Sequence, residues 1–597
     1  MAPTGAGPQQ PLYLEVGNER LFGVMHDADP LRDSGISVLF CPPFGWDEIC
    51  AHRAFLHWAE TLAAAGHRSL RIDLPGAGES SGSPRDPGRL DVWRDGVAGA
   101  GAWLAATERC RRVVALGVGL GGMLACLAWA DGAPIDDLVL WGVPARGRSL
   151  VRELRVFSRI ADAEIKLPDG AAPPATTDGS LEVAGFVLTA ETLASLEGLD
   201  LTAHSPEAAA DRSVLLLDRD GLPADRDLHE HLSKSAGVKH APGDGYASMM
   251  VHPELTEMPA TTFGTSLEWL ARLPRGSRPA AGAVPTAVRR VELATNGARI
   301  TESPFELELG GGVMRGTLVE PAPGAPRHGL CVVLANSGAV RRIGPSRGWV
   351  EASRRWAAIG VTSLRLDLLA IGDGDGDERE FRWTGAFYRP QRTRQLLAAL
   401  DALAARGVAE RFVLAGLCSG AYWSFHAALA DERVRATMLI NPWWFQWRDS
   451  VPLRRYARLA VELVRSGDLR EIARLARTEQ RLTRAVRAAL EPLRVAGRAR
   501  SPQKPLDATG EDFAVLHERG VQTLLLLGYG EALERELTSS GLIGRTAPWP
   551  GVVLERIPVA DHTFRPVWAQ RFVQAALDGW LERILASEVD ARDTPGG

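Results

Sequence analysis

Short runs of apolar residues alternate along the chain with longer segments in which apolar and polar residues mix. The runs SVLFC, from Ser37, and CVVLA, from Cys331, both end in turn-forming residues. Strands that are buried on both faces of a parallel sheet have this continuous apolar character. The longer segments carry apolar residues at helical spacing. The pattern predicts an α/β protein whose mostly parallel sheets are flanked by helices.

The alternation occurs twice, with matching sequences. The run LRIDL begins at Leu70 and LRLDL at Leu364, 294 residues later, and the same offset separates Ser37 from Cys331. Self-similarity at a fixed offset indicates that a structural unit is repeated. The chain is therefore predicted to contain two related α/β domains in tandem.

The composition between the repeats predicts where the domains begin and end. Residues 273–290 are rich in Pro, Gly and Ala without apolar periodicity, which is typical of a linker. This linker separates a first domain, residues 1–272, from a second, residues 291–597. Each domain is expected to carry a lid-like insert after its sixth core strand, at about 145–213 and about 443–516.

The sequence GLCSGA, residues 416–421, follows an apolar run and precedes a helix-like segment. A strand, a tight glycine-flanked turn and a helix form the nucleophile elbow of α/β-hydrolases, usually written G-x-S-x-G. Here Cys418 occupies the position of the serine. The counterpart in the first half, GVGLGG, has Gly119 there, which offers no nucleophile.

The second half supplies the remaining groups in the chain order nucleophile, acid, histidine. Glu531 follows the apolar run VQTLLLLG, and His562 lies in a loop after VVLERI. The imidazole would take the proton of the Cys418 thiol, and the carboxylate would orient the imidazole. Glu534 is an alternative acid. Ser419 is an alternative nucleophile, although it lies beside the apex of the turn.

An oxyanion hole requires two backbone N–H groups near the nucleophile. The first is predicted to be that of Ser419, directly after Cys418. The second is expected in the loop ANSGAV, from Ser337 or Gly338, where small residues allow a substrate to approach the backbone.

The first half lacks the corresponding chemical groups. Comparing PGDGYA with VADHTF places Gly245 opposite His562, while Asp218 or Asp220 would hold the position of the acid. We therefore predict a degenerate domain that packs on the second, shapes the entrance to its site or binds a partner. Other polar residues of this half are predicted to be surface or structural residues: His240, His252, Cys41 and Cys50.

Composition excludes several classes of function. The net charge of −5 gives no basic field for nucleic acid, and no apolar run approaches the roughly 20 residues of a membrane span. The N-terminal sequence lacks the basic and apolar regions of a signal peptide. Six cysteines without paired spacing and no metal-binding motif predict a reduced, cytoplasmic protein without a metal or cofactor.

The predicted insert of the second half is strongly basic. Residues 443–504 contain 15 Lys or Arg and 6 Asp or Glu. Such a surface would attract an acidic acyl carrier protein or the phosphates of coenzyme A, although solvated helical faces would have the same composition. Four aromatic residues at its start are predicted to line an acyl channel or to pack the insert onto its domain: Trp443, Trp444, Phe445 and Trp447.

Each half of the chain resembles a known protein family. The first half, with CPPFGWDEICAHRAFLHWAETLAAAGHRSLRIDLPGAGES, resembles exosortase A system-associated hydrolase 2, whose members often lack the elbow serine. The second half, with RIGPSRGWVEASRRWAAIGVTSLRLDLLAIGDGDG and GLCSGA, resembles exosortase A system-associated hydrolase 1, which typically carries G-L-C-x-G. The resemblance covers most of both halves apart from the inserts and the linker. It implies two α/β-hydrolase domains and a nucleophile at Cys418.

A cysteine nucleophile also indicates a reaction class. Its acyl-enzyme is a thioester, similar in free energy to an incoming acyl thioester, so that transfer both onto and off the enzyme is feasible. We therefore predict a thioesterase or acyltransferase that acts on carrier- or coenzyme A-bound acyl groups in natural-product biosynthesis. The alternatives are an esterase acting on lipid or exopolysaccharide precursors, a non-acyl reaction such as a cyclisation, and a non-catalytic binding or scaffold protein.

Overall fold

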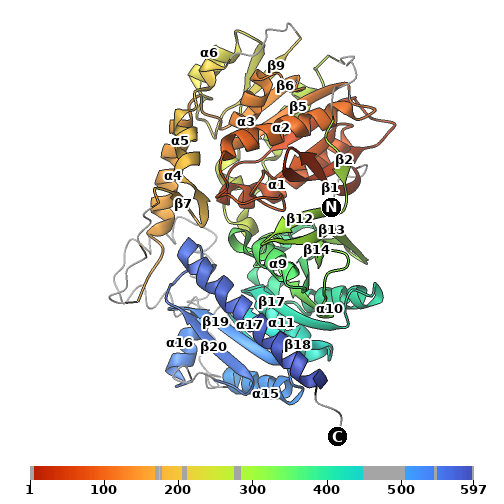
Figure 1. Ribbon diagram of the computed structural model, residues 1–597. Helices are drawn as coiled ribbons and strands as arrows, with labels where there is room; N and C mark the ends of the chain where they lie inside the picture. Colours follow the sequence, from red (N-terminus) through yellow and green to blue (C-terminus); the bar gives the residue numbers. More distant parts are fainter. Residues whose placement is uncertain are drawn as a thin grey trace, which may run out of the picture.

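A computed structural model shows two large sheets, one in each half of the chain, stacked along the long axis of the molecule (Figure 1). The structure describes residues 6–168, 174, 178–204, 211–274, 284–447, 504–542 and 548–593. The first half forms the upper part in Figure 1 and the second half the lower part.

The first sheet has nine strands, parallel from its first member to its sixth and antiparallel thereafter. Their spatial order is β10 (Gly237–Ala241), β9 (Ser213–Leu217), β6 (Asp137–Trp141), β5 (Arg112–Val118), β3 (Ile36–Cys41), β4 (Arg68–Ile72), β2 (Glu19–Ala28), β1 (Ala6–Val16) and β11 (Ala287–Val288).

The second sheet repeats this topology. Its spatial order, from the parallel edge, is β20 (Val552–Ile557), β19 (Gln522–Gly528), β18 (Val434–Ile440), β17 (Arg411–Leu417), β15 (Leu330–Leu334), β16 (Thr362–Asp367), β14 (Gly312–Pro321), β13 (Ala298–Leu309) and β12 (Val291–Thr295). Again the first six strands are parallel and the last three antiparallel. The two sheets therefore have the same order and the same strand directions.

Helices flank both sheets. The first half contains α1 (Trp46–Ala64), α2 (Arg89–Ala106), α3 (Leu120–Ala130), α4 (Gly147–Asp162), α5 (Ala190–Gly198), α6 (Arg226–Leu232), α7 (Tyr246–Met249) and α8 (Ala260–Leu270). The second contains α9 (Gly348–Ala358), α10 (Pro390–Ala405), α11 (Ser419–Ala430), α15 (Lys504–Glu518), α16 (Ala532–Ser539) and α17 (Val567–Asp593). The predicted α/β class, with mostly parallel sheets and flanking helices, is confirmed.

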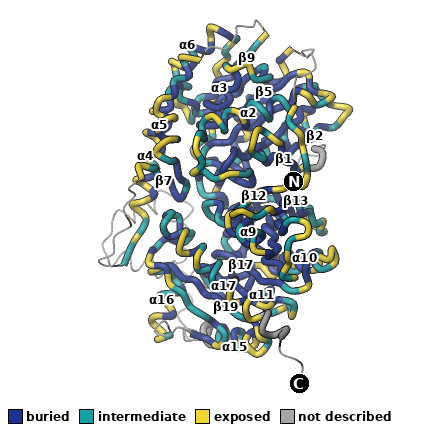
Figure 2. Tube along the Cα trace, in the orientation of Figure 1, coloured by how far each residue is buried: buried dark blue, intermediate teal, exposed yellow. Residues whose placement is uncertain are grey.

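The apolar runs of the sequence form the central strands. Every residue of β3, β5 and β15 is buried, because helices cover both faces of the parallel part of each sheet. In Figure 2 the labelled strand β5 is dark blue, whereas yellow exposed residues mark α4, α5 and α6 at the edge of the molecule. Continuous burial explains why these strands read as uninterrupted apolar runs.

The predicted linker and first insert contain ordered structure. The last part of residues 273–290 is not a free linker, because β11 pairs with β1 through Tyr13 opposite Val288. The first insert contains α4, the hairpin β7 (Leu181–Val183) and β8 (Phe186–Leu188), and α5. Most of the second predicted insert, from residue 448 to 503, lies outside the described residues. The domain boundaries themselves remain a prediction.

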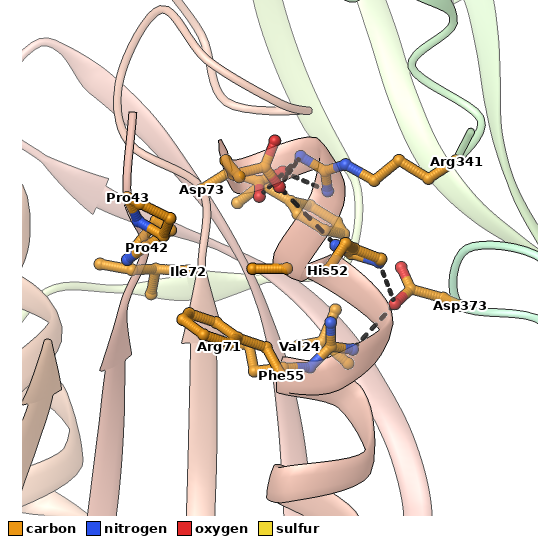
Figure 3. A pocket seen from close by; sticks show the side chains of 13 residues that line it. Val24, Pro42, Pro43, His52, Phe55, Arg71, Ile72, Asp73, Arg341 and Asp373 are labelled. Atoms are coloured by element: carbon orange, nitrogen blue, oxygen red, sulfur yellow. Dashed lines mark hydrogen bonds and ion pairs between the residues drawn. The ribbon is translucent and has the colours of Figure 1, made fainter. Parts of the chain in front are cut away.

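Buried charges join the two halves. Arg71 of the first half contacts Asp373 of the second at 2.8 Å, and Arg365 of the second forms an ion pair with Glu79 of the first. Arg71 and Arg365 are 294 residues apart, as are Glu79 and Asp373, so the two contacts are reciprocal. Figure 3 shows Arg71 and His52 converging on Asp373. Reciprocal contacts of this kind are the mark of a two-fold related interface.

None of the described helices is long and apolar enough to cross a membrane. Within the same ranges there is no group of three or more His, Cys, Asp or Glu side chains that could hold a metal ion.

Candidate active site

The turn between β17 and α11 places Cys418 at the carboxyl edge of the second sheet. Cys418 has φ 59° and ψ −117° and is the N-cap of α11. A positive φ is costly for a residue with a side chain, and such strain is concentrated at functional sites. The turn is also very tight, because a Cβ at Gly420 would lie 2.2 Å from the carbonyl oxygen of Asn336. These features are those of a nucleophile elbow.

The first half has kept the backbone of this turn without its side chain. Gly119 has φ 54° and ψ −119° and is the N-cap of α3. A Cβ at Gly121 would lie 2.1 Å from the carbonyl oxygen of Cys41, which matches the close approach at Gly420. The two elbows therefore differ in chemistry rather than in backbone geometry.

His562 and Glu531 come together as the chain order of the motifs predicted. His562 Nδ1 lies 3.1 Å from Glu531 Oε2. Glu531 is the N-cap of α16, after β19, and His562 lies in the loop between β20 and α17. Both loops leave the carboxyl ends of parallel strands, which explains how residues far apart in sequence meet at one edge.

The electrostatics of His562 connect it with Cys418. Burial lowers the pKa of the His562 imidazole, but the negative charges of the Cys418 sulfur and of Glu531 outweigh burial and raise it to about 10. His562 Nε2 is buried and has no hydrogen-bond partner of standard geometry among the described residues. The site thus favours the protonated imidazolium form of His562.

Cys418 is distinguished from the other cysteines by its exposure. All six cysteines lie in the described part of the chain and are free thiols, and Cys418 is the one that is not buried. Burial raises the pKa of the Cys41 and Cys50 thiols well above the usual range, which suppresses their thiolates. Cys41 and Cys50 are therefore placed as structural residues.

Two residues after β18 support the histidine. Asn441 Nδ2 donates to the carbonyl oxygen of His562 at 2.8 Å, and Asn441 Oδ1 accepts from Gly528 N–H at 2.7 Å. The indole Nε1 of Trp443 lies 3.2 Å from His562 Nδ1. When Nδ1 carries a proton it donates to Glu531, and when it does not it can accept from the indole. Asn441 was not among the predicted site residues, although it begins the NPWW turn.

The candidate oxyanion loop lies against the elbow. Gly338 N–H donates to Ser419 Oγ at 3.2 Å, and Ser337 is buried. Asn336 fixes the loop, because its amide Nδ2 donates to Asp367 Oδ1 at 2.8 Å. Ser419 is itself buried, with 1% of its surface exposed. Its hydroxyl thus holds the loop in place, and the exposed group of the elbow is Cys418.

The aromatic residues at the start of the second insert divide into two sets. Trp443 lies against His562, and Trp447 stacks on Tyr388 with ring centroids 4.3 Å apart. Trp444 contacts the same tyrosine. Phe445 instead is 3% exposed and packs in the domain core, where the sequence allowed either a channel or a core position. The basic segment that follows lies outside the described residues from 448 to 503.

In the first half, other groups fill the equivalent site. The Asp220 carboxylate accepts from the N–H groups of Gly245, Tyr246 and Ala247 at 2.6, 3.1 and 2.7 Å. The acid position thus faces the position of the missing histidine, as the sequence predicted for Asp218 or Asp220. The Tyr246 hydroxyl lies 3.9 Å from where a Cβ of Gly119 would be. The tyrosine ring therefore occupies the space above this elbow.

The other residues considered in the sequence analysis lie outside the Cys418 site and the equivalent site of the first half. His240 is exposed, and His252 pairs with Glu254. Asp218 accepts from Ala224 N–H at 3.1 Å. Glu534 faces Arg556 at 4.0 Å on the first turn of α16, whereas Glu531 contacts the histidine.

One family model matches part of the first half. Residues 38–257 match the alpha/beta hydrolase family, a range that includes the Gly119 elbow. No curated protein matches the chain. Among solved structures, Est1E from Butyrivibrio proteoclasticus with bound ferulic acid is 17% identical, with a TM-score of 0.31, over 44% of this chain and 98% of its own.

Two other solved structures are similar over about half of the chain or slightly less. The α/β hydrolase GrgF from Penicillium is 14% identical, with a TM-score of 0.32, over 45% of this chain and 99% of its own. Dienelactone hydrolase from Anabaena variabilis is 15% identical, with a TM-score of 0.29, over 50% of this chain and 99% of its own. The family match and the strand order together give the α/β-hydrolase fold.

Proposed function

We propose that the protein is a cysteine-dependent acyl-transfer enzyme of the thioesterase or acyltransferase type, with Cys418 as nucleophile. One observation supports the proposal most strongly, the electrostatic setting of His562. Its Nδ1 lies 3.1 Å from Glu531 Oε2, and the Cys418 sulfur and the Glu531 carboxylate raise the pKa of the imidazole to about 10. An imidazolium beside a strained, partly exposed cysteine at a helix N-terminus is the setting of a reactive thiolate.

The acylation step follows from these groups. The Cys418 thiolate attacks the carbonyl carbon of an acyl thioester and forms a tetrahedral oxyanion. Collapse of this intermediate breaks the original carbon–sulfur bond, and the leaving thiolate takes the proton of the His562 imidazolium. The products are an acyl thioester on Cys418, a free thiol and a neutral imidazole.

The neutral imidazole then serves as base for the second half of the reaction. It removes a proton from water, an amine, an alcohol or a thiol, which attacks the acyl-Cys418 carbonyl. The Cys418 thiolate leaves, and His562 again carries the proton. Glu531 keeps Nδ1–H directed toward itself and so leaves Nε2 facing the sulfur.

Backbone N–H groups would stabilise the oxyanion. The N–H of Ser419 begins α11, so the positive end of the helix dipole adds to it. The second donor is assigned to Ser337 or Gly338. Gly338 N–H already donates to Ser419 Oγ, so it would have to exchange this hydrogen bond for one to the oxyanion.

The chemistry of sulfur favours activated donors. The acyl-enzyme on Cys418 would be a thioester, close in free energy to an acyl thioester of coenzyme A or of a carrier protein. The acyl group could therefore be transferred onto the enzyme reversibly. The 15 Lys or Arg against 6 Asp or Glu within residues 443–504 would attract such acidic donors, and attraction of this type weakens as salt increases. Natural-product biosynthesis, in which acyl chains are carried as thioesters, is the setting that we propose.

The proposal is tested by mixing the protein with an acyl thioester and measuring its intact mass. We expect one acyl group per chain in the wild type and none in Cys418→Ala. In His562→Ala the rate of acylation should fall by about 10²- to 10⁴-fold, the usual contribution of a general acid–base group. Labelling that persists in Cys418→Ala would refute the assignment.

A further inference from the structure

The insert of the first half reaches the histidine loop of the second. Lys166, four residues after the end of α4, forms an antiparallel bridge with Ala560, two residues before His562. Ala560 N–H donates to the Lys166 carbonyl oxygen at 2.7 Å, and Lys166 N–H lies 3.5 Å from the Ala560 carbonyl oxygen. In Figure 1 the insert runs from α5 and α4 down toward the upper end of α17, which follows this loop.

The side chains beside the bridge alternate as they do in a strand. Lys166 is exposed, whereas Ile165 and Leu167 are half-buried. Residues separated by two positions in an extended segment point to the same face. Ile165 and Leu167 pack against the large apolar cluster of the second half that includes Leu417 and Val559, and Cys418 packs against the same cluster. Two apolar side chains of the first half therefore pack on the same core cluster as Cys418, next to the loop that carries His562.

A second segment of the same insert holds the other end of the loop. Glu182, in β7, accepts from Val567 N–H at 2.9 Å, and Gln570 Nε2 donates to the carbonyl oxygen of Gly185 at the same distance. A Cβ at Gly185 would lie 2.7 Å from the carbonyl oxygen of Arg565, so this contact requires glycine. The insert thus contacts the loop on both sides of His562.

We propose that the insert of the first half forms a wall of the Cys418 site and that Ile165 and Leu167 limit the size of the acyl group accepted there. The inference rests on the proposed function only for the nature of the ligand. The degenerate half would then contribute substrate selection to a reaction whose nucleophile, base and acid all belong to the other half.

Two measurements test the wall. The first is the rate of acylation with a series of acyl thioesters of increasing length and branching. Leu167→Ala should raise the rate for the bulkiest acyl group relative to the smallest by about tenfold or more, the discrimination that one or two methylene groups give in an apolar pocket. Leu167→Trp should lower the same ratio of rates. If one of the two variants folds poorly, the other still tests the proposal.

The second measurement does not require enzymatic activity. Iodoacetamide and a bulky benzyl maleimide compete to modify Cys418, with Cys418→Ala as background. The ratio of bulky to small modification should rise in Ile165→Ala and Leu167→Ala. It should stay unchanged in Ile160→Ala, a matched control on α4 whose side chain is 59% exposed.

The outcomes separate the two proposals. If Cys418 takes no acyl group but the modification ratio responds to Leu167, the wall stands and the proposed reaction fails. If Cys418 is acylated while the ratio and the length profile match the wild type in all three wall variants, the reaction stands and the wall is overturned.

Discussion

Cys418 and Gly119 occupy the same backbone conformation, with φ of 59° and 54°. Their surroundings differ. His562 interacts with Cys418, whereas in the first half Gly245 takes the position of the histidine and donates its N–H to Asp220. Because a nucleophile requires a base within reach, changing Gly119 alone would not create a second site.

The charge of Glu531 contributes to the raised pKa of His562, and Glu531→Gln removes that charge while keeping the shape. We expect the pKa of His562 to fall from its value of about 10. A raised pKa stabilises the fold fully below the unfolded-state value of about 6.5, and this contribution is lost as pH rises through the folded-state value. In Glu531→Gln this contribution should therefore be smaller, and its loss should be complete at a lower pH than in the wild type.

The measurement is an NMR titration of the imidazole, together with unfolding curves as a function of pH. Glu534→Gln, on the same helix turn and facing Arg556, is the control and should leave the titration of His562 unchanged. A fall in the pKa with Glu534→Gln and none with Glu531→Gln would assign the acid to Glu534.

At the scale of elements, the strand–turn–helix unit of β17 and α11 sets the position of the thiol. Gly420→Ala would place a Cβ 2.2 Å from the Asn336 carbonyl oxygen, which belongs to the backbone of the oxyanion loop. We expect a loss of about 1–3 kcal/mol of unfolding free energy, as for other overpacked sites, together with loss of acylation.

Gly579→Ala provides the contrast, because Gly579 lies within α17 and a Cβ there meets no atom within 4 Å. This change should increase the free energy of unfolding by about 0.5–1 kcal/mol. Chemical denaturation of both variants measures the difference. Equal stability of the two variants would contradict the close packing of the elbow.

Site residues that directly follow a strand can be predicted from the sequence, whereas contacts between elements distant in sequence cannot. Cys418, Glu531 and His562 each follow an apolar run, so the run itself places them at the carboxyl edge of a sheet. The bridge of Lys166 to Ala560 joins segments from different halves, and neither carries a motif. Phe445 was ambiguous because a run of aromatic residues has no periodicity that separates a core position from a channel.

At the scale of the whole molecule, buried ion pairs hold the halves together. The reciprocal contacts of Arg71 with Asp373 and of Arg365 with Glu79 lie between two sheets of identical topology. The sequence places these charges directly in or after strands, but it does not indicate that they pair across the two halves. Their burial depends on the partner half, which no local pattern reveals.

Glu79→Ala tests this interface. Glu79 is fully buried and contacts Arg342 at 3.0 Å as well as Arg365. Removing one member of a buried network leaves charges without compensation, at a cost of about 3–5 kcal/mol. The exposed pair of Glu230 with Arg226 is the control, and Glu230→Ala should cost less than about 1 kcal/mol. Similar midpoints of urea unfolding for both variants would contradict the role of the interface.

The same carboxylate predicts sensitivity to acid. Burial raises the pKa of Glu79, but the charges of Arg365 and Arg342 outweigh burial and lower it. A lowered pKa contributes stability above the unfolded-state value of about 4.3 and loses it as pH falls through the folded-state value. The stability difference between wild type and Glu79→Ala should therefore shrink below about pH 4.

The central claim is that Cys418 is the nucleophile of this molecule and that the equivalent turn at Gly119 has none. The most direct measurement is peptide mass mapping after the full chain is mixed with an acyl thioester and quenched in acid. We predict a single acyl adduct on the peptide that contains Cys418, with none on peptides that contain Cys41 or Cys50, and no adduct in Cys418→Ala. An adduct on Ser419 or on any residue of the first half, or a Cys418 peptide that stays unmodified, would contradict the claim.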